Sequence, residues 1–228
     1  MIQVTASVIV LSADFSDSVS WDSTLAGRPL IQHCIDNAKQ IPVLDQIYVL
    51  TDNETLLRLK AVYGVQIKKI PEWLTNHQID LISKDVWQVN YGLERLQELS
   101  VLGEVHFVLN WRMPLVRPIT FEKMYHNLLE DRLAARVTGI YPVDPNLFMF
   151  QNSNHSLFPV WADPGADRQR VPQLFRQLPL GVIHTRRHKG ICLESKGYVV
   201  PRAEGLVIHD AEYLDMAAFF LEDRMSDQ

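Results

Sequence analysis

Three aspartates stand in the loop that follows the first apolar run of the chain. Asp14, Asp17 and Asp22 lie within SADFSDSVSWDSTLAGRPL at 12–30, which holds no basic residue before Arg28 and no glycine before Gly27. Such a loop between strand and helix usually meets phosphates through glycine amides and cationic side chains. Carboxylates suit a divalent cation instead, with Asp210 as a further ligand. The alternative is a solvated turn whose Asp and Ser side chains cap backbone amides, and the spacing matches no known calcium loop.

Strands and helices alternate around this loop. The β-branched run at 4–12 predicts a strand buried on both faces, and helical spacing of apolar residues predicts a helix at 30–41. Asp52 or Asn53 can cap the next helix, and Thr120 is expected to cap the helix at 121–130. Further strands are expected at 46–51, 65–70, 104–110 and 134–141, and a further helix at 85–99. This alternation predicts a mostly parallel sheet with right-handed crossovers.

The alternation of strands and helices stops at 142–180, a span rich in proline with little periodicity. We expect this span to be an excursion from the core. Beyond it, short strands are expected at 180–185, 190–195, 197–202 and 205–209. A closing helix is expected from Asp210, with Leu214, Ala217 and Leu221 on one side. The domain organisation expected is one domain over 1–228 with a protruding segment.

Composition limits the classes of function. The chain has 228 residues, 47% of them hydrophobic, and a net charge of -5. It therefore lacks the excess of positive charge that nucleic-acid binding usually needs. The basic cluster at 186–189 reads more simply as a solvated hairpin tip than as a phosphate clamp. Cys34 and Cys192 are far apart, which favours a reducing compartment over a disulfide. No signal peptide and no membrane span is expected, so we expect a cytoplasmic protein.

Several phrases, in order, resemble one enzyme family. LAGRPLI at 25–31 stands where the cytidylyltransferases that activate acidic sugars, the CMP-sialic acid and CMP-Kdo synthetases, read Leu-Ala-Gly-Lys-Pro-Leu-Ile. LTDNE at 50–54 is similar to their Ser-Thr-Asp-Asp-Glu. LNWRMPLVRP at 109–118 stands at their Leu-Gln-Pro-Thr-Ser-Pro-Leu-Arg or, in the CMP-Kdo motif, Gln-Gly-Asp-Glu-Pro-Leu-Ile. RQRVP at 168–172 is similar to their Arg-Gln-Asp-Leu-Pro. The similarity spans almost the whole chain.

The resemblance implies the fold and the ligands. The fold would be a three-layer, Rossmann-like α/β sandwich of the nucleotide-diphospho-sugar transferase type, whose protruding segment builds a homodimer. The reaction would be attack of a sugar hydroxyl on the α-phosphate of CTP, with Mg²⁺. It implies nucleotide contacts from Leu11, Ser12, Ala13 and Asp52. It implies contacts to an acidic sugar from Asn110, Arg112, Arg168 and Gln169.

The chain departs from the family where charge matters most. The family's first loop reads Ala-Arg-Gly-Gly-Ser-Lys, whereas Ser12 and Ala13 stand near the arginine position and no lysine follows. The family's Asp-Ile-Asp before the last helix aligns with Val207, Ile208 and His209, and the Asp of the CMP-Kdo motif aligns with Arg112. Phosphate and metal groups are therefore both replaced, and we name no catalytic residue and no metal ligand.

Some residues allow a functional and a structural interpretation. Asn110 either faces a sugar or forms a turn, and Trp111 beside Arg112 is either a stacking platform or, more often, packing at a strand end. Arg168 and Gln169 either bind a carboxylate or form an interface ion pair. Asp52 is expected to be a helix cap first and a nucleotide contact second. Histidines 155, 184, 188 and 209 show no metal spacing and are expected to be structural or exposed.

Two functions follow. One is a non-catalytic relative, a pseudoenzyme that keeps the scaffold while transfer chemistry is lost or strongly altered. The alternative is an active nucleotidyltransferase that makes a CMP-activated acid sugar for a surface glycan through an atypical phosphate or metal site. The first explains the acidic loop directly, whereas the second needs a cation on its aspartates or a side chain from a partner.

Overall fold

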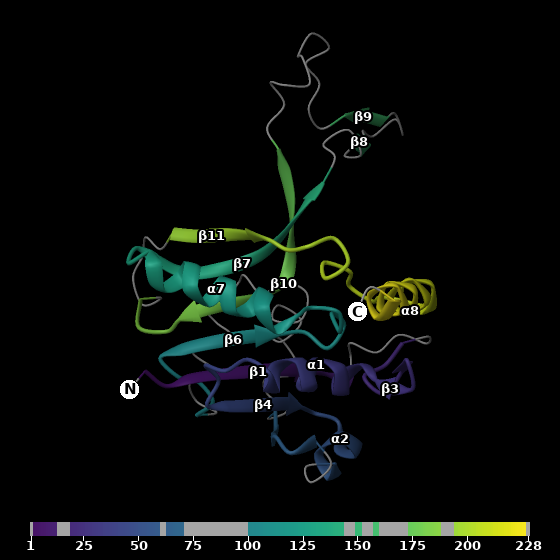
Figure 1. Cartoon of the computed structure of the whole chain (residues 1–228), viewed down its shortest axis with the longest axis horizontal. Helices are drawn as coiled ribbons and strands as arrows, with labels where there is room; N and C mark the ends of the chain where they lie inside the picture. The colour runs from purple at the N-terminus through teal and green to yellow at the C-terminus, as the bar shows by residue number, and fades with distance from the viewer. Residues whose placement is uncertain are drawn as a thin grey trace.

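A seven-stranded sheet runs through the middle of the protein, in the order β11-β7-β10-β6-β1-β4-β5 (Figure 1). The structure is a computed structural model that describes residues 2–12, 19–59, 63–70, 100–143, 149–151, 157–159, 173–187 and 194–226. The sheet strands are β1 (Val4–Val10), β4 (Gln46–Thr51), β5 (Gln66–Lys69), β6 (Val105–Leu109), β7 (Ala134–Val143), β10 (Leu174–His184) and β11 (Glu194–Val199). Two small hairpins join β2 (Thr24–Leu25) to β3 (Arg28–Pro29), and β8 (Met149–Gln151) to β9 (Leu157–Pro159).

The sheet is mostly parallel, as the sequence predicts. β10 runs antiparallel to both neighbours, β6 and β7, while the other described pairings in the sheet are parallel. Parallel strands need buried faces, and β1 is buried at every position but Ile9. This confirms the mostly parallel α/β sheet that the sequence predicts.

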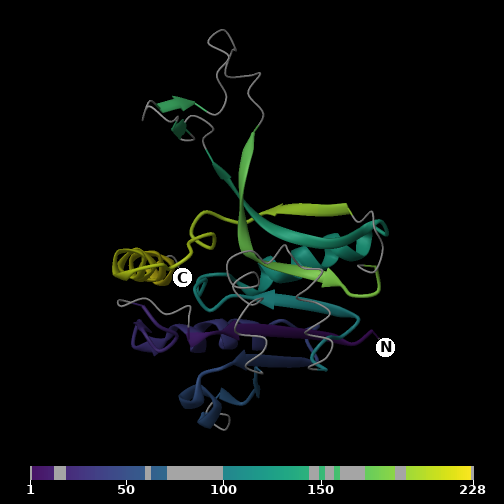
Figure 2. The same ribbon diagram turned by 180° about the vertical axis from the view of Figure 1, so that it is seen from behind.

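The described helices flank the sheet. They are α1 (Leu30–Lys39), α2 (Glu54–Arg58), α7 (Pro118–Glu130) and α8 (Ala211–Ser226). α1 and α7 lie on the same face, in front of the sheet in Figure 1 and behind it in Figure 2. The core under α7 includes Phe107 of β6, whose ring lies 6.1 Å from Phe121 and 5.9 Å from Tyr125. In the described residues, no helix has the length and apolar character needed to cross a membrane.

Most expected elements form near their expected bounds, but some differ. β10 begins at Leu174, inside the span expected to be an excursion, because Leu178 and Leu180 are buried. One continuous strand, Glu194–Val199, spans the described end of the strand expected at 190–195 and the start of the one expected at 197–202; residues 190–193 lie outside the described residues, and 205–209 is not a strand. The closing helix begins at Ala211, with Ala217 buried as expected. The helix expected at 85–99 lies outside the described residues.

The expected cap of the α7 helix is wrong. α7 begins at Pro118 with Arg117 as its N-cap, so Thr120 lies inside the first turn. Capping comes from Glu204, which is fully buried: its Oε2 accepts the Arg117 N–H at 3.0 Å and the Thr120 hydroxyl at 2.6 Å, and its Oε1 accepts Arg117 Nε at 2.5 Å. A carboxylate at a helix N-terminus also interacts favourably with the helix dipole.

A buried histidine joins β1 to β6. His106 Nδ1 lies 2.8 Å from Thr5 Oγ1, and its Nε2 lies 2.9 Å from Ser7 Oγ. Thr5 Oγ1 already accepts the Gly103 N–H at 2.7 Å, so a Thr5 hydroxyl that donates to Nδ1 and an Nε2–H that donates to Ser7 satisfy every group. Burial lowers the pKa of His106 to about 3. The imidazole is therefore a neutral hydrogen-bonding group of the core.

We expect His106 to make stability depend on pH. The unfolded chain binds a proton near the ordinary pKa of 6.5, whereas the folded protein does so only near pH 3. The contribution of His106 to the free energy of unfolding is therefore complete above about pH 6.5 and falls by about 1.4 kcal/mol per pH unit toward pH 3. Urea unfolding of His106→Gln between pH 7.5 and pH 4.5 should show a shallower loss than wild type. Exposed His126→Gln is the control, and equal slopes in all three proteins would contradict the assignment.

Glu204 offers a second stability test. Glu204→Ala leaves the Arg117 N–H and the Thr120 hydroxyl without their buried acceptor, so we expect a loss of about 2–4 kcal/mol in the free energy of unfolding. Glu130→Ala, at the exposed end of the same helix, should change it by less than about 0.5 kcal/mol. A loss below about 1 kcal/mol for Glu204→Ala would mean that water replaces the carboxylate.

Candidate functional site

The carboxyl edge of the parallel strands gathers most of the predicted site residues that the structure describes. Leu11 and Ser12 follow β1, Asp52 follows β4, and Asn110 and Arg112 follow β6. This edge, on the right in Figure 1, faces α8. Ligands of open α/β sheets bind outside the carboxyl ends of the strands, so the edge is where a site is expected.

Ser12 and Asp52 bond to each other across this edge. Asp52 Oδ1 accepts the Ser12 N–H at 2.8 Å and the Ser12 hydroxyl at 3.1 Å, while Leu11 is buried behind them. The prediction that Asp52 is a helix cap first is wrong, because Asn53 is the N-cap of α2 and its Oδ1 accepts the Leu56 N–H at 3.0 Å. Of the two residues that the sequence offered as caps of this helix, Asn53 is therefore the N-cap.

Asn110 forms a turn, the structural one of its two interpretations. Its Oδ1 accepts the Arg112 N–H at 2.8 Å, and its backbone carbonyl accepts the Met113 N–H at 3.0 Å. The amide oxygen is thus used within the chain, at the point where β6 ends. The side chain also borders a small hollow of about 10 Å³ beside Cys34, too small for a ligand. Burial raises the pKa of the Cys34 thiol to about 12, so this thiol stays protonated.

Trp111 packs at the strand end as expected, and Arg112 covers it. The indole is 2% exposed, and the Arg112 Cζ lies 5.0 Å from the ring centroid, a cation–π contact. The Arg112 carbonyl accepts the Ile208 N–H at 2.8 Å. The segment before α8 is thereby held against the end of β6, and the two positions that align with acidic residues of the family, 112 and 209, come together.

His209 belongs to this group, although sequence reasoning treated it as structural or exposed. Burial lowers its pKa first, and then the positive charges of Arg112 and Arg176 lower it further, while Asp210 raises it. Asp210 itself caps α8, since its Oδ1 accepts the Tyr213 N–H at 3.1 Å. The spacing of the sequence does not predict that Arg176 lies at this edge. It lies there because β10 runs antiparallel to β6 and begins at this edge. His184, at the other edge, is buried near Glu104 with its Nε2 3.9 Å away, and is structural.

The described part of the acidic loop is a self-bonded turn. The Ser20 hydroxyl donates to Asp22, and the Ser20 N–H donates to Ser23 Oγ at 2.9 Å. For Asp22 this agrees with the solvated-turn interpretation. The first amides of α1 are also used: Leu30 N donates to the Ser23 carbonyl at 2.9 Å and Ile31 N to the Trp21 carbonyl at 3.1 Å. These two amides are therefore not offered to a phosphate.

The phrase LAGRPLI forms the hairpin that leads into α1. Ala26 at φ 48° and Gly27 at φ 74° make the two-residue turn, and Leu25 pairs with Arg28. Positive φ at both central residues is the signature of a type I′ hairpin turn. Arg28, the first basic residue after the acidic loop, lies 3.3 Å from Asp36 of α1 through its Nη1. The guanidinium of Arg28 thus pairs with the helix.

Several predicted residues lie outside the described residues. They are Ala13, Asp14, Asp17, Arg168, Gln169, His155, His188 and Cys192. The nucleotide role of Ala13, the sugar role of Arg168 and Gln169, and a cation on the aspartates stay predictions.

Mg²⁺, which the resemblance implies, does not fit the two described residues, Arg112 and His209, that stand where the family has acidic groups. Magnesium prefers carboxylate and carbonyl oxygens, whereas Arg112 and His209 are nitrogen groups that carry or can carry positive charge. Within the described ranges, no three His, Cys, Asp or Glu side chains stand close enough to hold a metal ion.

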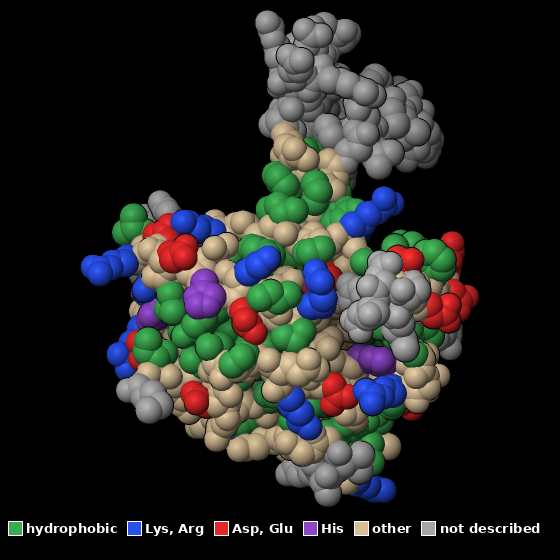
Figure 3. Space-filling view, in the orientation of Figure 1, with side chains coloured by type: hydrophobic (Ala, Val, Ile, Leu, Met, Phe, Trp, Pro, Cys, Tyr) green, Lys and Arg blue, Asp and Glu red, His purple; other side chains and the backbone are tan. Residues whose placement is uncertain are grey.

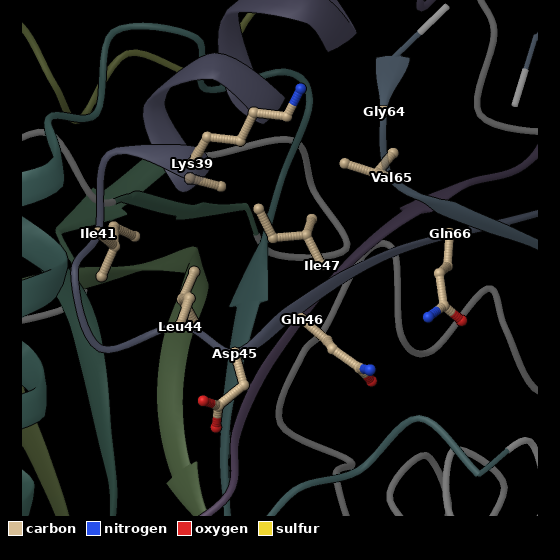
Figure 4. A pocket seen from close by; sticks show the side chains of 10 residues that line it. Lys39, Ile41, Leu44, Asp45, Gln46, Ile47, Gly64, Val65 and Gln66 are labelled. Carbon is tan, nitrogen blue, oxygen red and sulfur yellow. The ribbon is translucent and has the colours of Figure 1, made fainter. Parts of the chain in front are cut away.

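The larger hollow lies at the opposite edge of the sheet (Figure 4). It measures about 500 Å³ and is bordered by the end of α1 and the starts of β4 and β5. Lys39 Nζ at its rim donates to the Tyr63 carbonyl at 2.6 Å, and Asp45 Oδ2 accepts the Val4 N–H at 2.8 Å. None of the predicted site residues that the structure describes lines it.

Comparisons with known proteins point to a cytidylyltransferase-like fold. The cytidylyltransferase family model matches residues 23–76, from the hairpin through α1, β4 and β5. The resemblance to cytidylyltransferases is confirmed. A structure of CMP:2-keto-3-deoxy-manno-octonic acid synthetase complexed with CTP has a TM-score of 0.68 at 12% identity, over 97% of this chain and 99% of that chain. A 4-diphosphocytidyl-2C-methyl-D-erythritol synthase from Anaerococcus prevotii has a TM-score of 0.65 at 12% identity, with the same coverage. A search of curated protein sequences finds no significant match.

The different roles of Asp52 and Asn53 can be tested by stability. Asn53→Ala removes the cap of α2 and should lower the free energy of unfolding by about 1 kcal/mol. Asn53→Asp keeps an acceptor at the cap and should restore most of the loss, whereas Asp52→Asn should leave α2 capped. Urea unfolding of the three variants provides the measurement. If Asn53→Ala were neutral, the assignment of the cap would be wrong.

Proposed function

We propose that this cytidylyltransferase-like protein is related to the enzymes that activate acidic sugars, of the sialic acid type, as CMP-sugars for surface glycans, and that its catalysis is lost or strongly altered. The observation that carries the proposal is the meeting of Arg112 and His209 at the carboxyl edge. A guanidinium and an imidazole there cannot take the place of carboxylates as ligands of a magnesium ion.

The first loop supports the same proposal. Nucleotidyl transfer relies on positioning and on neutralising phosphate charge. Segment 12–27 has no lysine or arginine, and Arg28 pairs with Asp36. A charged hydrogen bond contributes about 1.5–3 kcal/mol, so the loss of two would cost roughly 10² to 10⁴ in rate. The remaining interactions at the edge, such as Ser12 with Asp52, hold the scaffold in shape.

The alternative function is an active nucleotidyltransferase with an atypical phosphate or metal site. The family match over 23–76 and the likeness to a synthetase complexed with CTP favour it. In that case Mg²⁺ would be the cofactor, with Asp14, Asp17 and Asp22 as carboxylates that could hold a cation.

The proposed partners follow from the same scaffold. CTP or CMP would contact Leu11, Ser12, Ala13 and Asp52, and an acidic sugar would contact Asn110, Arg112, Arg168 and Gln169. A homodimer is proposed through the protruding span 142–180. Hydrophobic side chains gather where β7 and β10 leave the body (Figure 3), and Phe175 there is 45% exposed. The proposed location is the cytoplasm.

Calorimetry and a turnover assay test this proposal. Titration with CTP in Mg²⁺, followed by a pyrophosphate-release assay over several acid sugars, should show no release above background even where nucleotide binds. A complete synthetase assayed in parallel is the positive control. Release that depends on both CTP and a sugar acid would overturn the proposal and favour the active alternative.

A further inference from the structure

A hollow of about 500 Å³ opens at the edge of the sheet opposite the carboxyl ends of its parallel strands (Figure 4). It lies beyond the end of α1 and over the starts of β4 and β5, bordered by residues from 38–47 and 64–66. Sites that bind small molecules measure roughly 300–1,000 Å³, so the volume is sufficient for one. We refer to this space as the α1 hollow.

Backbone hydrogen bonds fix the wall that leads from α1 into β4. The Ile41 N–H donates to the Ala38 carbonyl at 3.0 Å, and the Leu44 N–H donates to the Ile41 carbonyl at 3.2 Å. Asp45 then bonds twice to the start of β1, since its N–H donates to the Val4 carbonyl at 2.9 Å and its Oδ2 accepts the Val4 N–H at 2.8 Å. This wall therefore has its shape without a ligand.

Lys39 ties α1 to the opposite wall. Its Nζ donates to the Tyr63 carbonyl at 2.6 Å, and the Tyr63 side chain is buried in the core. Gly64 follows in the left-handed region at φ 59°, and a Cβ there would lie 3.4 Å from the same Nζ. An ammonium group has three N–H donors and the bond to Tyr63 uses one, so Lys39 can bind a ligand while it holds this wall.

The lining combines apolar side chains with two opposite charges. Lys39 and Asp45 stand on opposite sides of the hollow in Figure 4, with Ile47 between them and Val65 beside it. Ile47 and Val65 are only half-buried, whereas Ile67, further along β5, is 1% exposed. A ligand that covers the two half-buried side chains removes apolar surface from water, which favours its binding.

The charges of the lining narrow the class of ligand. A nucleoside triphosphate would be attracted by Lys39 but repelled by Asp45, whereas a zwitterion matches both charges. The side-chain amides of Gln46 and Gln66 also border the hollow, and Gln46 Oε1 accepts the Tyr48 hydroxyl. Amide groups can donate to and accept from the peptide groups of a ligand.

We propose that the α1 hollow binds a small zwitterion with an apolar body, either a free amino acid or a short peptide with apolar side chains. Lys39 binds its carboxylate, Asp45 binds its ammonium group, and Ile47 and Val65 contact its apolar part. The site lies at the opposite edge from the residues proposed to contact nucleotide and sugar. It therefore goes beyond the proposed function and does not depend on it.

Calorimetry on the full chain tests the site. The probes are leucine, the dipeptide Leu-Leu and the tripeptide Leu-Gly-Leu, which separate a free amino acid from a peptide. At least one of the three should bind wild type. Lys39→Gln and Asp45→Asn should each weaken its binding by about tenfold or more, because each removes one charged hydrogen bond. Asp45→Asn keeps an oxygen that can accept the Val4 N–H, so the wall should stay ordered.

Each variant has a matched control that makes the same change in charge outside the hollow. Lys123→Gln alters an exposed lysine of α7, and Asp215→Asn alters an exposed aspartate of α8. Both controls should bind the probe as wild type does. Urea unfolding checks that Lys39→Gln, which also loses the bond to the Tyr63 carbonyl, is folded. If it is not, the result with Asp45→Asn is decisive.

Modified probes assign the two ends of the ligand. N-acetylation removes its ammonium group, so wild type should bind the acetylated probe about tenfold more weakly, whereas Asp45→Asn should bind the acetylated and free probes about equally. Amidation removes its carboxylate, and the same comparison then applies to Lys39→Gln.

Three results would overturn the site. They are the failure of all three probes to bind wild type, equal binding by wild type and both hollow variants, and an equal loss in the hollow variants and their controls. Loss confined to Lys39→Gln and Asp45→Asn supports the site. No part of the test uses CTP or the release of pyrophosphate, so its result leaves the proposed function to be judged by its own assay.

Discussion

The structure depends on one buried carboxylate, that of Glu204. It is fully buried, and a buried carboxylate is tolerated only where hydrogen bonds replace its water. Arg117 and Thr120 supply them, which both starts α7 and ties the chain after β11 to that helix. From this anchor the chain reaches Ile208 after a few residues and bonds to the turn after β6. The position of His209 therefore follows from that of Glu204.

Backbone satisfaction explains the described end of the acidic loop, from residue 19 onward. A helix N-terminus attracts phosphate because its first amides lack partners. Here the first two amides of α1 donate to the carbonyls of Trp21 and Ser23, and Ser20 and Asp22 bond within the turn. A loop that meets its own hydrogen-bonding needs has no requirement for glycine or lysine. The described part of the loop thus agrees with its composition.

Local pattern predicted the sheet but not the links between distant residues. β1 and β4 were predictable because buried parallel strands are continuous apolar runs, and α1 because its apolar residues recur at helical spacing. The start of α7 was missed because its capping group lies 84 residues beyond Thr120. Arg176 was missed for the same kind of reason, since only the antiparallel course of β10 brings it near His209. The family alignment did identify positions 112 and 209 as places where acidic residues are replaced. The structure brings these two positions together, which the spacing of the sequence does not predict.

Replacing carboxylates with a guanidinium and an imidazole changes what the edge can do with an anion. Fixed guanidinium groups attract an oxyanion in its ground state about as well as in a transition state of similar charge, and such uniform binding gives affinity without acceleration. Transfer also needs groups aimed at the places where charge develops in the transition state, including a metal ion that neutralises the phosphate oxygens. Arg112, held over Trp111 and anchored beside Ile208, is fixed at one point of the edge. An edge built in this way is suited to holding an anionic ligand rather than to breaking its phosphate bond.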